Sequence, residues 1–198
     1  YEARRFAEVF GETRSDQDAI VRTLARFPHA CQVRGMFFDG LANVIRKHLG
    51  KEKTHALMED VGVTTRVVGF QLYPHRDFYK LYFAAAPRLF PGTRLAVALE
   101  NVAETFYPVF RESMLGRTMA PLMGKDPPKA LERLTQAYRI SVPWNEHTLE
   151  LPRPGEAIWR CRVEPSEFYP DTLRGIINGT LKSHDMPEAT VMLQSKDE

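Results

Sequence analysis

Aromatic residues are the side chains of this sequence best suited to building a binding site. Eight of them lie on two neighbouring stretches: Phe78, Tyr79, Tyr82, Phe83, Phe90, Phe106, Tyr107 and Phe110. Rings at this density either form a protein core or wall a pocket for a flat apolar ligand. The two interpretations are both open on the sequence. The pocket hypothesis assigns ligand binding to these residues: Phe78, Tyr82, Phe106, Phe110, Tyr138 and Trp159.

The polar residues show no comparable pattern. The six histidines include no His-x-His or His-x-x-x-His pair, and Cys31 and Cys161 are far apart. Zinc sites normally draw their ligands from such local pairs. There is also no nucleophile elbow, no P-loop and no Gly-x-Gly-x-x-Gly turn. We therefore expect no catalytic residue, no metal and no cofactor, and a protein that is not an enzyme.

One polar pair near the aromatic residues keeps an enzyme as an alternative: a dyad of His75 and Tyr82. Other charged groups have structural explanations. Glu100 and Glu104 are one helical turn apart and are expected to face solvent. Arg160 and Arg162 share a strand face that suits an acidic partner, but cross-strand ion pairs with nearby glutamates are the commoner arrangement.

Helices are expected to position most of the aromatic residues. Hydrophobic periodicity predicts helices over about 15–27, 35–49, 54–59, 78–89, 95–110, 127–138 and 170–181. Pro87 and Pro108 lie inside two of them, where proline removes a hydrogen bond and crowds the preceding turn. We expect a bend or a break at each, and these bends would open the pocket.

Alternating residues predict strands in the last part of the chain. Residues 147–151 and 157–163 form a hairpin around the turn at 152–155, and 189–193 form a last strand. Residues 64–74 are expected to be extended. Gly175 and Gly179 are expected to let the helix between the strands lie close on the sheet.

These elements predict an α+β fold. The mostly helical N-terminal two-thirds packs on a small antiparallel sheet in the C-terminal third, in the order strand, strand, helix, strand. Residues 1–198 are expected to form a single domain. It comprises an N-terminal helical extension (1–30), a helical body (31–143) and the strand-strand-helix-strand unit (144–198).

The composition excludes extreme classes of protein. The chain has 27 Lys and Arg and 25 Asp and Glu, a net charge of +2, so no strong field favours nucleic acid or an anionic membrane. No apolar run approaches the about 18 to 20 residues of a membrane helix, and no signal peptide begins the sequence. We expect a cytoplasmic protein that binds neither nucleic acid nor membrane.

Several short motifs resemble a known family. They are Val33-Arg34-Gly35-Met36-Phe37-Phe38, Tyr73-Pro74, Ala84-Ala85-Ala86, Pro91-Gly92, Leu115-Gly116-Arg117, Gly124-Lys125-Asp126-Pro127 and the stretch from Leu173 to Gly179. Together they resemble a myxobacteria-restricted family catalogued as a domain of unknown function, over about Ala30 to Leu193. The element order is more distantly similar to H-NOX heme domains and 4-vinyl-reductase-type ligand-binding domains. This resemblance implies a small molecule or a partner subunit held against the helical layer.

Heme itself is not expected. The resemblance to H-NOX would require a proximal histidine before the sheet and a Tyr-x-Ser-x-Arg clamp for the propionates. Leu134 and Tyr138 occupy the relevant helix, and Tyr169 and Arg174 have the wrong spacing. We therefore expect a non-enzymatic sensory or regulatory module that binds a small apolar molecule or a protein partner. The alternative is an interaction scaffold that forms a homodimer and binds no small molecule.

Overall fold

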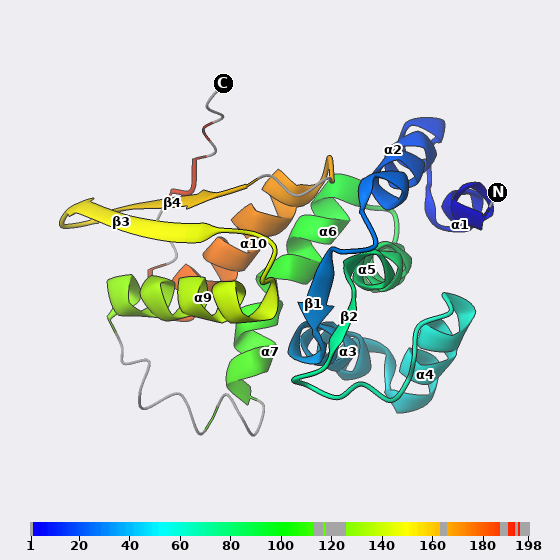
Figure 1. Ribbon diagram of the computed structural model, residues 1–198, viewed down its shortest axis with the longest axis horizontal. Coiled ribbons are helices and arrows are strands. Elements are labelled where there is room, and N and C mark those ends of the chain that lie inside the picture. Colours follow the sequence, from blue (N-terminus) through cyan, green and yellow to red (C-terminus); the bar gives the residue numbers. More distant parts are fainter. Residues whose placement is uncertain are drawn as a thin grey trace.

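Helices dominate the protein, and two separate antiparallel sheets of two strands each accompany them (Figure 1). The computed structural model describes residues 2–112, 117, 126–162, 166–186, 190–192 and 194. The predicted mostly helical α+β class is confirmed. Within the described part of the chain, no helix has both the length and the apolar character needed to cross a membrane.

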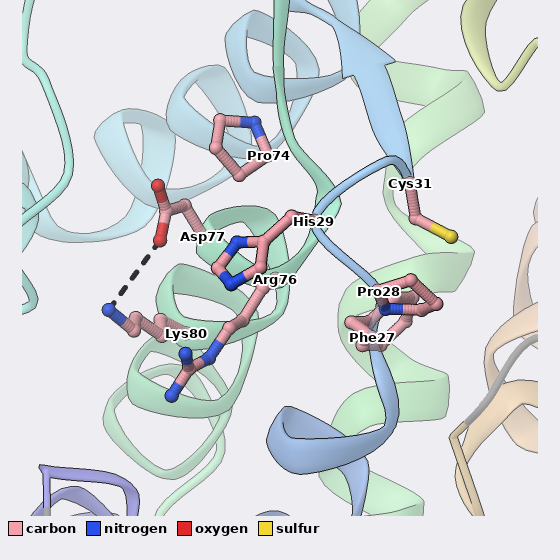
Figure 2. Close-up of a pocket in the computed structure, with 8 residues that line it drawn as sticks. All are labelled: Phe27, Pro28, His29, Cys31, Pro74, Arg76, Asp77 and Lys80. Carbon is pink, nitrogen blue, oxygen red and sulfur yellow. Dashed lines mark ion pairs between the residues drawn. The ribbon is translucent and has the colours of Figure 1, made fainter.

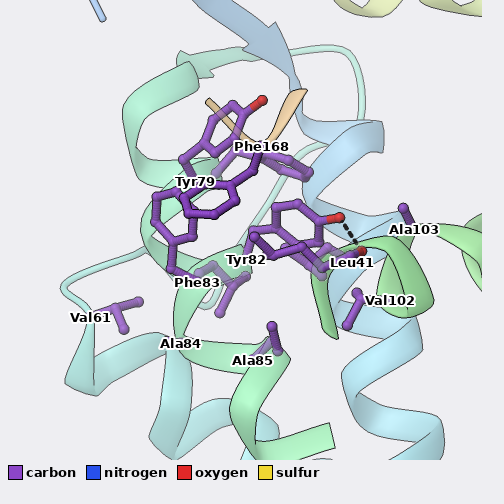
Figure 3. Packing of buried hydrophobic residues seen from close by; sticks show 14 of the residues in the cluster. Leu41, Val61, Tyr79, Tyr82, Phe83, Ala84, Ala85, Val102, Ala103 and Phe168 are labelled. Atoms are coloured by element: carbon purple, nitrogen blue, oxygen red, sulfur yellow. Dashed lines mark hydrogen bonds between the residues drawn. The ribbon is translucent and has the colours of Figure 1, made fainter. Parts of the chain in front are cut away.

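The centre of the fold is α5 (His75–Leu89). Every residue from Leu81 to Ala86 has an exposed fraction of 0%. A helix that is apolar on all sides must be surrounded by other elements. The helices that contact α5 include α1 (Glu2–Phe10), α2 (Arg14–Arg26), α3 (Gly35–Leu49), α4 (Lys51–Asp60) and α6 (Leu95–Glu104). Figure 3 shows Leu41 of α3 and Val102 and Ala103 of α6 packed near the buried side chains of α5.

The N-terminal helices belong to this core. Phe10, Ile20, Leu24 and Phe27 are buried in the same hydrophobic cluster as α5. The N-cap of α2 is Thr13, which exchanges hydrogen bonds with Asp16 in a capping box, so the helix begins before the Ser15 that the sequence suggested. The 1–30 segment therefore covers one side of α5 through buried contacts.

The two prolines behave differently. The predicted 95–110 helix divides at Thr105 into α6 and α7 (Phe106–Glu112), so Pro108 lies in a first turn, where its missing N–H costs nothing. This break is as expected. By contrast, α5 continues through Pro87 and ends at Leu89, so the helix is not broken there.

The C-terminal hairpin is confirmed. β3 (His147–Arg153) pairs with β4 (Glu156–Cys161), with Leu149 opposite Trp159, and α9 (Pro127–Ser141) lies along β3. The hairpin extends to one side of the molecule (Figure 1). The last predicted strand has no counterpart at 190–192 or 194, which are not in a strand, while Ala189 and Leu193 are outside the described residues.

A second small sheet was not predicted. β1 (Gln32–Arg34) pairs with β2 (Leu72–Pro74), so that Val33 lies opposite Tyr73. Only the last three residues of the extended 64–74 segment are in this strand. The sheet brings the start of α3 beside the start of α5, because each helix follows directly on its strand.

The position of α10 (Tyr169–Lys182) corrects a prediction. Gly175 and Gly179 do not face a sheet; they lie against the backbone of α6 at Glu100 and Glu104. A Cβ atom at either glycine would come within 3.0 Å of a carbonyl oxygen of α6. The missing side chains therefore allow two helices, rather than a helix and a sheet, to approach closely.

Candidate functional site

Three of the predicted ligand-binding residues form one stack. Phe78 and Tyr82 lie on α5, with ring centroids 5.8 Å apart, and Phe106 on α7 is 6.0 Å from Tyr82. Phe78 is 3% exposed and Tyr82 is 0% exposed. Phe110 follows Phe106 by one turn on α7 and is half-buried.

Tyr138 and Trp159 form a neighbouring pair, with ring centroids 5.4 Å apart and planes nearly perpendicular. Phe37 of α3 joins this pair to the stack, because it lies 5.2 Å from Tyr138 and 5.6 Å from Phe78. The structure thus brings together five of the six predicted residues through a ring that the sequence analysis did not assign to the site. Tilted and edge-on contacts of this kind are those of a packed core.

The hydroxyl of Tyr82 is used within the protein. It donates to the carbonyl of Leu99 on α6, the hydrogen bond marked in Figure 3, and accepts from Thr172 of α10 at 3.3 Å. Burial raises the pKa of Tyr82 well above its ordinary value of 10.0. The hydroxyl therefore stays protonated and ties α5 to both helices.

The two buried histidines are neutral. His75 lies among the rings of Phe27, Tyr79 and Trp144, at 5.0, 5.3 and 5.5 Å, and burial lowers its pKa to about 3. His147 accepts a hydrogen bond at Nδ1 from Trp159 Nε1. Burial, and then the charge of Arg139, lower the pKa of His147 to about 4.

A pocket of about 210 Å³ lies beside the aromatic core, where the α2–β1 connection faces the first turns of α5 (Figure 2). We call it the α5 pocket; it is lined by Phe27, Pro28, His29, Cys31, Pro74, Arg76, Asp77 and Lys80. The backbone N–H of His75 donates to the carbonyl of Cys31 at 2.9 Å and so holds the two walls together.

Charges in the α5 pocket are unequally satisfied. Lys80 lies 3.0 Å from Glu2 and 3.5 Å from Asp77, so its charge is compensated. Arg76 makes no ion pair or hydrogen bond within the described part of the chain, and its Nε atom is shut off from solvent. The charge of Glu2 also acts on Arg76, so two carboxylates balance the two cations at this pocket, and the Nε–H of Arg76 is a buried donor without an acceptor.

None of the pocket residues was assigned to a site from the sequence. The segments that form the pocket are separated by more than forty positions, from Cys31 to Pro74, and no motif joins them. The sequence signal that could have indicated the pocket was a pair of prolines. Pro28 follows the end of one helix, and Pro74 precedes the start of another.

Exposed apolar side chains form a second candidate surface, which we call the Phe70 patch. It consists of Val68, Phe70, Leu72 and Ile140, which are 59, 75, 40 and 55% exposed. The guanidinium of Arg34 donates to the carbonyls of Phe70 and Ile140 at 2.9 and 2.8 Å, so the ends of the patch are fixed side by side.

The charged groups are mostly structural. Arg160 forms the expected cross-strand ion pair with Glu150. Glu100 and Glu104 are not simply solvated: they pair with Arg174 and Lys182 of α10. Across the described residues, no three His, Cys, Asp or Glu side chains gather as a metal site would require.

The comparisons with known proteins identify a family and no activity. A family model described as a protein of unknown function (DUF2378) matches residues 27–198, which include every residue of the α5 pocket and of the Phe70 patch. No curated protein matches the sequence. The Leu115-Gly116 and Gly124-Lys125 motifs lie outside the described residues, but within the matched range. Because the match covers most of its length, the chain belongs to the DUF2378 family, whose function is unknown.

Proposed function

We propose that this protein is a non-enzymatic sensory or regulatory module that binds a small molecule in the α5 pocket. The observation that carries this proposal is the pocket itself, formed where the α2–β1 connection meets α5 (Figure 2). Phe27, Pro28 and Pro74 give it an apolar wall, as the expected apolar ligand requires. Small-molecule sites are typically concave and largely apolar, with a few polar groups that fix orientation.

The pocket has a direct physical connection to the core. The ring of Phe27 lines the pocket and also lies 4.8 Å from Tyr79 and 6.4 Å from Trp144. Trp144 lies in the connection between α9 and β3. A ligand that displaces Phe27 would therefore alter the packing of α5 and of the segment that leads into the hairpin.

Other features of the sequence support the same class of function. The distant resemblance to H-NOX and 4-vinyl-reductase-type domains suggests a helical layer that holds a small molecule, and the motifs suggest a myxobacterial origin. The low cysteine content suggests a cytoplasmic location. The proposed module is therefore a cytoplasmic protein of myxobacterial origin.

Native mass spectrometry tests the proposal. The protein is purified from its own host and compared before and after denaturing extraction. We expect a retained small molecule in the unsubstituted protein and in His55→Trp, a substitution at an exposed position on α4, outside the pocket. His29→Trp should remove the bound mass, because the larger ring fills the pocket. Retention of the same mass in His29→Trp would place the ligand elsewhere.

A homodimer is the second candidate function, and the Phe70 patch favours it. Around a two-fold axis a surface meets its own copy. Burial of the exposed apolar side chains of the patch against a second copy is favourable. Phe70→Ser should therefore convert a dimer to a monomer in sedimentation velocity, whereas Val9→Ser, at another exposed site on α1, should not. A monomer at all concentrations for the unsubstituted chain would exclude this function.

A further inference from the structure

We propose that the ligand of the α5 pocket is a small organic acid, whose carboxylate binds Arg76 and whose short apolar part lies against Phe27, Pro28 and Pro74. This inference rests on the proposed function and names its ligand class. It follows from the size of the pocket, from the buried Nε–H of Arg76 that has no acceptor, and from the position of the pocket at the start of a helix.

Size restricts the ligand. The pocket volume is about 210 Å³. This volume is less than the roughly 300 Å³ of the smallest drug-sized sites. A short acid fits, whereas a heme or a nucleotide does not.

An unused donor favours a carboxylate. Lys80 pairs with Glu2 and Asp77, whereas the Nε–H of Arg76 makes no hydrogen bond within the described part of the chain. An Nε–H that is shut off from solvent without an acceptor is costly, and a carboxylate would satisfy it. The planar guanidinium also matches the two oxygens of a carboxylate in a way that an ammonium group does not.

The backbone at the start of α5 also favours a negatively charged ligand. Arg76 and Asp77 lie in the first turn of α5, and the N-cap residue Pro74 provides no side-chain hydrogen bond. The N–H groups of a first helical turn carry partial positive charge that favours anions. Phe27 and Pro28 lie across the pocket from Asp77 and Lys80, so the two ends of an amphipathic acid find different surroundings (Figure 2).

Nuclear magnetic resonance with defined probes tests the inference. The ¹⁵N-labelled chain is titrated with butyrate, butyramide, n-butylamine and inorganic phosphate, and the Arg76 Nε–H signal and the backbone signals of the pocket are followed. Butyrate should shift both sets of signals and bind at least about tenfold more tightly than butyramide. Arg76→Gln should weaken butyrate binding about ten- to hundredfold. Arg76→Lys should restore only part of it, because the fork is lost.

Arg66→Gln is the matched control, since Arg66 is exposed and does not line the pocket. It should leave butyrate binding unchanged, and the spectrum of Arg76→Gln must retain the dispersion of the folded chain. Equal binding of butyramide and butyrate, or tight butyrate binding by Arg76→Gln, would overturn the acid while leaving a pocket for small molecules. Preferential binding of n-butylamine, or of phosphate over butyrate, would also overturn it. If no probe shifts any pocket signal, the proposed function fails as well.

Discussion

His147 shows how one buried side chain can make the whole protein sensitive to acid. It is 1% exposed, and its Nδ1 accepts a hydrogen bond from Trp159. Protonation would place a charge in the protein interior, remove this acceptor and repel Arg139. The folded protein therefore binds a proton at His147 less readily than the unfolded chain does.

The sign of the pH effect follows from this difference. The folded pKa is about 4, against an ordinary value of 6.5, so between these limits only the unfolded chain binds the proton. We expect the free energy of unfolding to fall as the pH decreases through this range. In His147→Phe, the slope near pH 5 should be smaller by about 1.4 kcal/mol per pH unit. Urea unfolding at several pH values measures it.

His55→Phe is the control for this prediction, because His55 is exposed. Its slope should match that of the unsubstituted protein. An unchanged slope in His147→Phe would show that His147 titrates normally in the folded state. His75, with a pKa of about 3, should contribute to the acid sensitivity in the same direction.

The helices α6 and α10 pack closely against each other at two glycines. Gly175 and Gly179 admit the backbone of α6, and ion pairs flank the contact on its polar side. Arg174 reaches Glu100 with two donors, one at 2.8 Å, and also pairs with Asp171. The glycines set the distance between the helices, and the ion pairs fix their register.

Substitution of either glycine tests this arrangement. Gly175→Ala or Gly179→Ala should lower the free energy of unfolding by about 1 to 3 kcal/mol, because backbone atoms of α6 cannot move aside for the added methyl group. Thermal and urea denaturation measure the change.

Gly40→Ala provides the opposite result as a control. Gly40 lies inside α3, and an added Cβ meets no atom within 4 Å. Alanine there should stabilise the protein by about 0.5 to 1 kcal/mol, since it restricts the unfolded chain. A neutral effect at Gly175 and Gly179 would mean that α10 is not held against α6.

Over the whole molecule, stability is distributed unevenly. The middle of α5 is fully buried among other helices, whereas the β3–β4 hairpin extends outwards and most of its residues are exposed or half-buried. Regions with few buried contacts open locally at a lower free energy than a central helix does.

Hydrogen exchange should reveal this order. Amides from Leu81 to Ala86 should exchange only when the whole protein unfolds, and those from Leu151 to Glu156 should exchange much faster. Mass spectrometry of peptic fragments follows both segments in one experiment. Equal protection of the two would contradict the central position of α5.

Local patterns were sufficient for most of the helices and for the hairpin. Apolar residues at helical spacing predicted α3 and its end at Gly50, and proline after an acid predicted the start of α9. Alternation around a turn that contains Gly155 predicted β3 and β4. These elements depend on residues a few positions apart, so the information lies within each segment.

Non-local contacts decided the rest. β1 and β2 are each only three residues long, and Gln32 pairs with Pro74, so no local pattern could reveal the sheet. Gly175 packs against whichever element lies next to α10 in the folded chain. The sequence alone did not show whether this element is the helix α6 or a sheet.

The candidate sites divide in the same way. The sequence by itself determined that aromatic residues are concentrated on the stretch that forms α5 and on the stretch that follows it. Only the tertiary structure decided that Phe37 joins these rings, that a pocket lies beside them and that the Nε–H of Arg76 has no acceptor there. The physical reason is that the surroundings of a charged group depend on which residues lie near it in three dimensions. The walls of this pocket come from segments that meet only after folding.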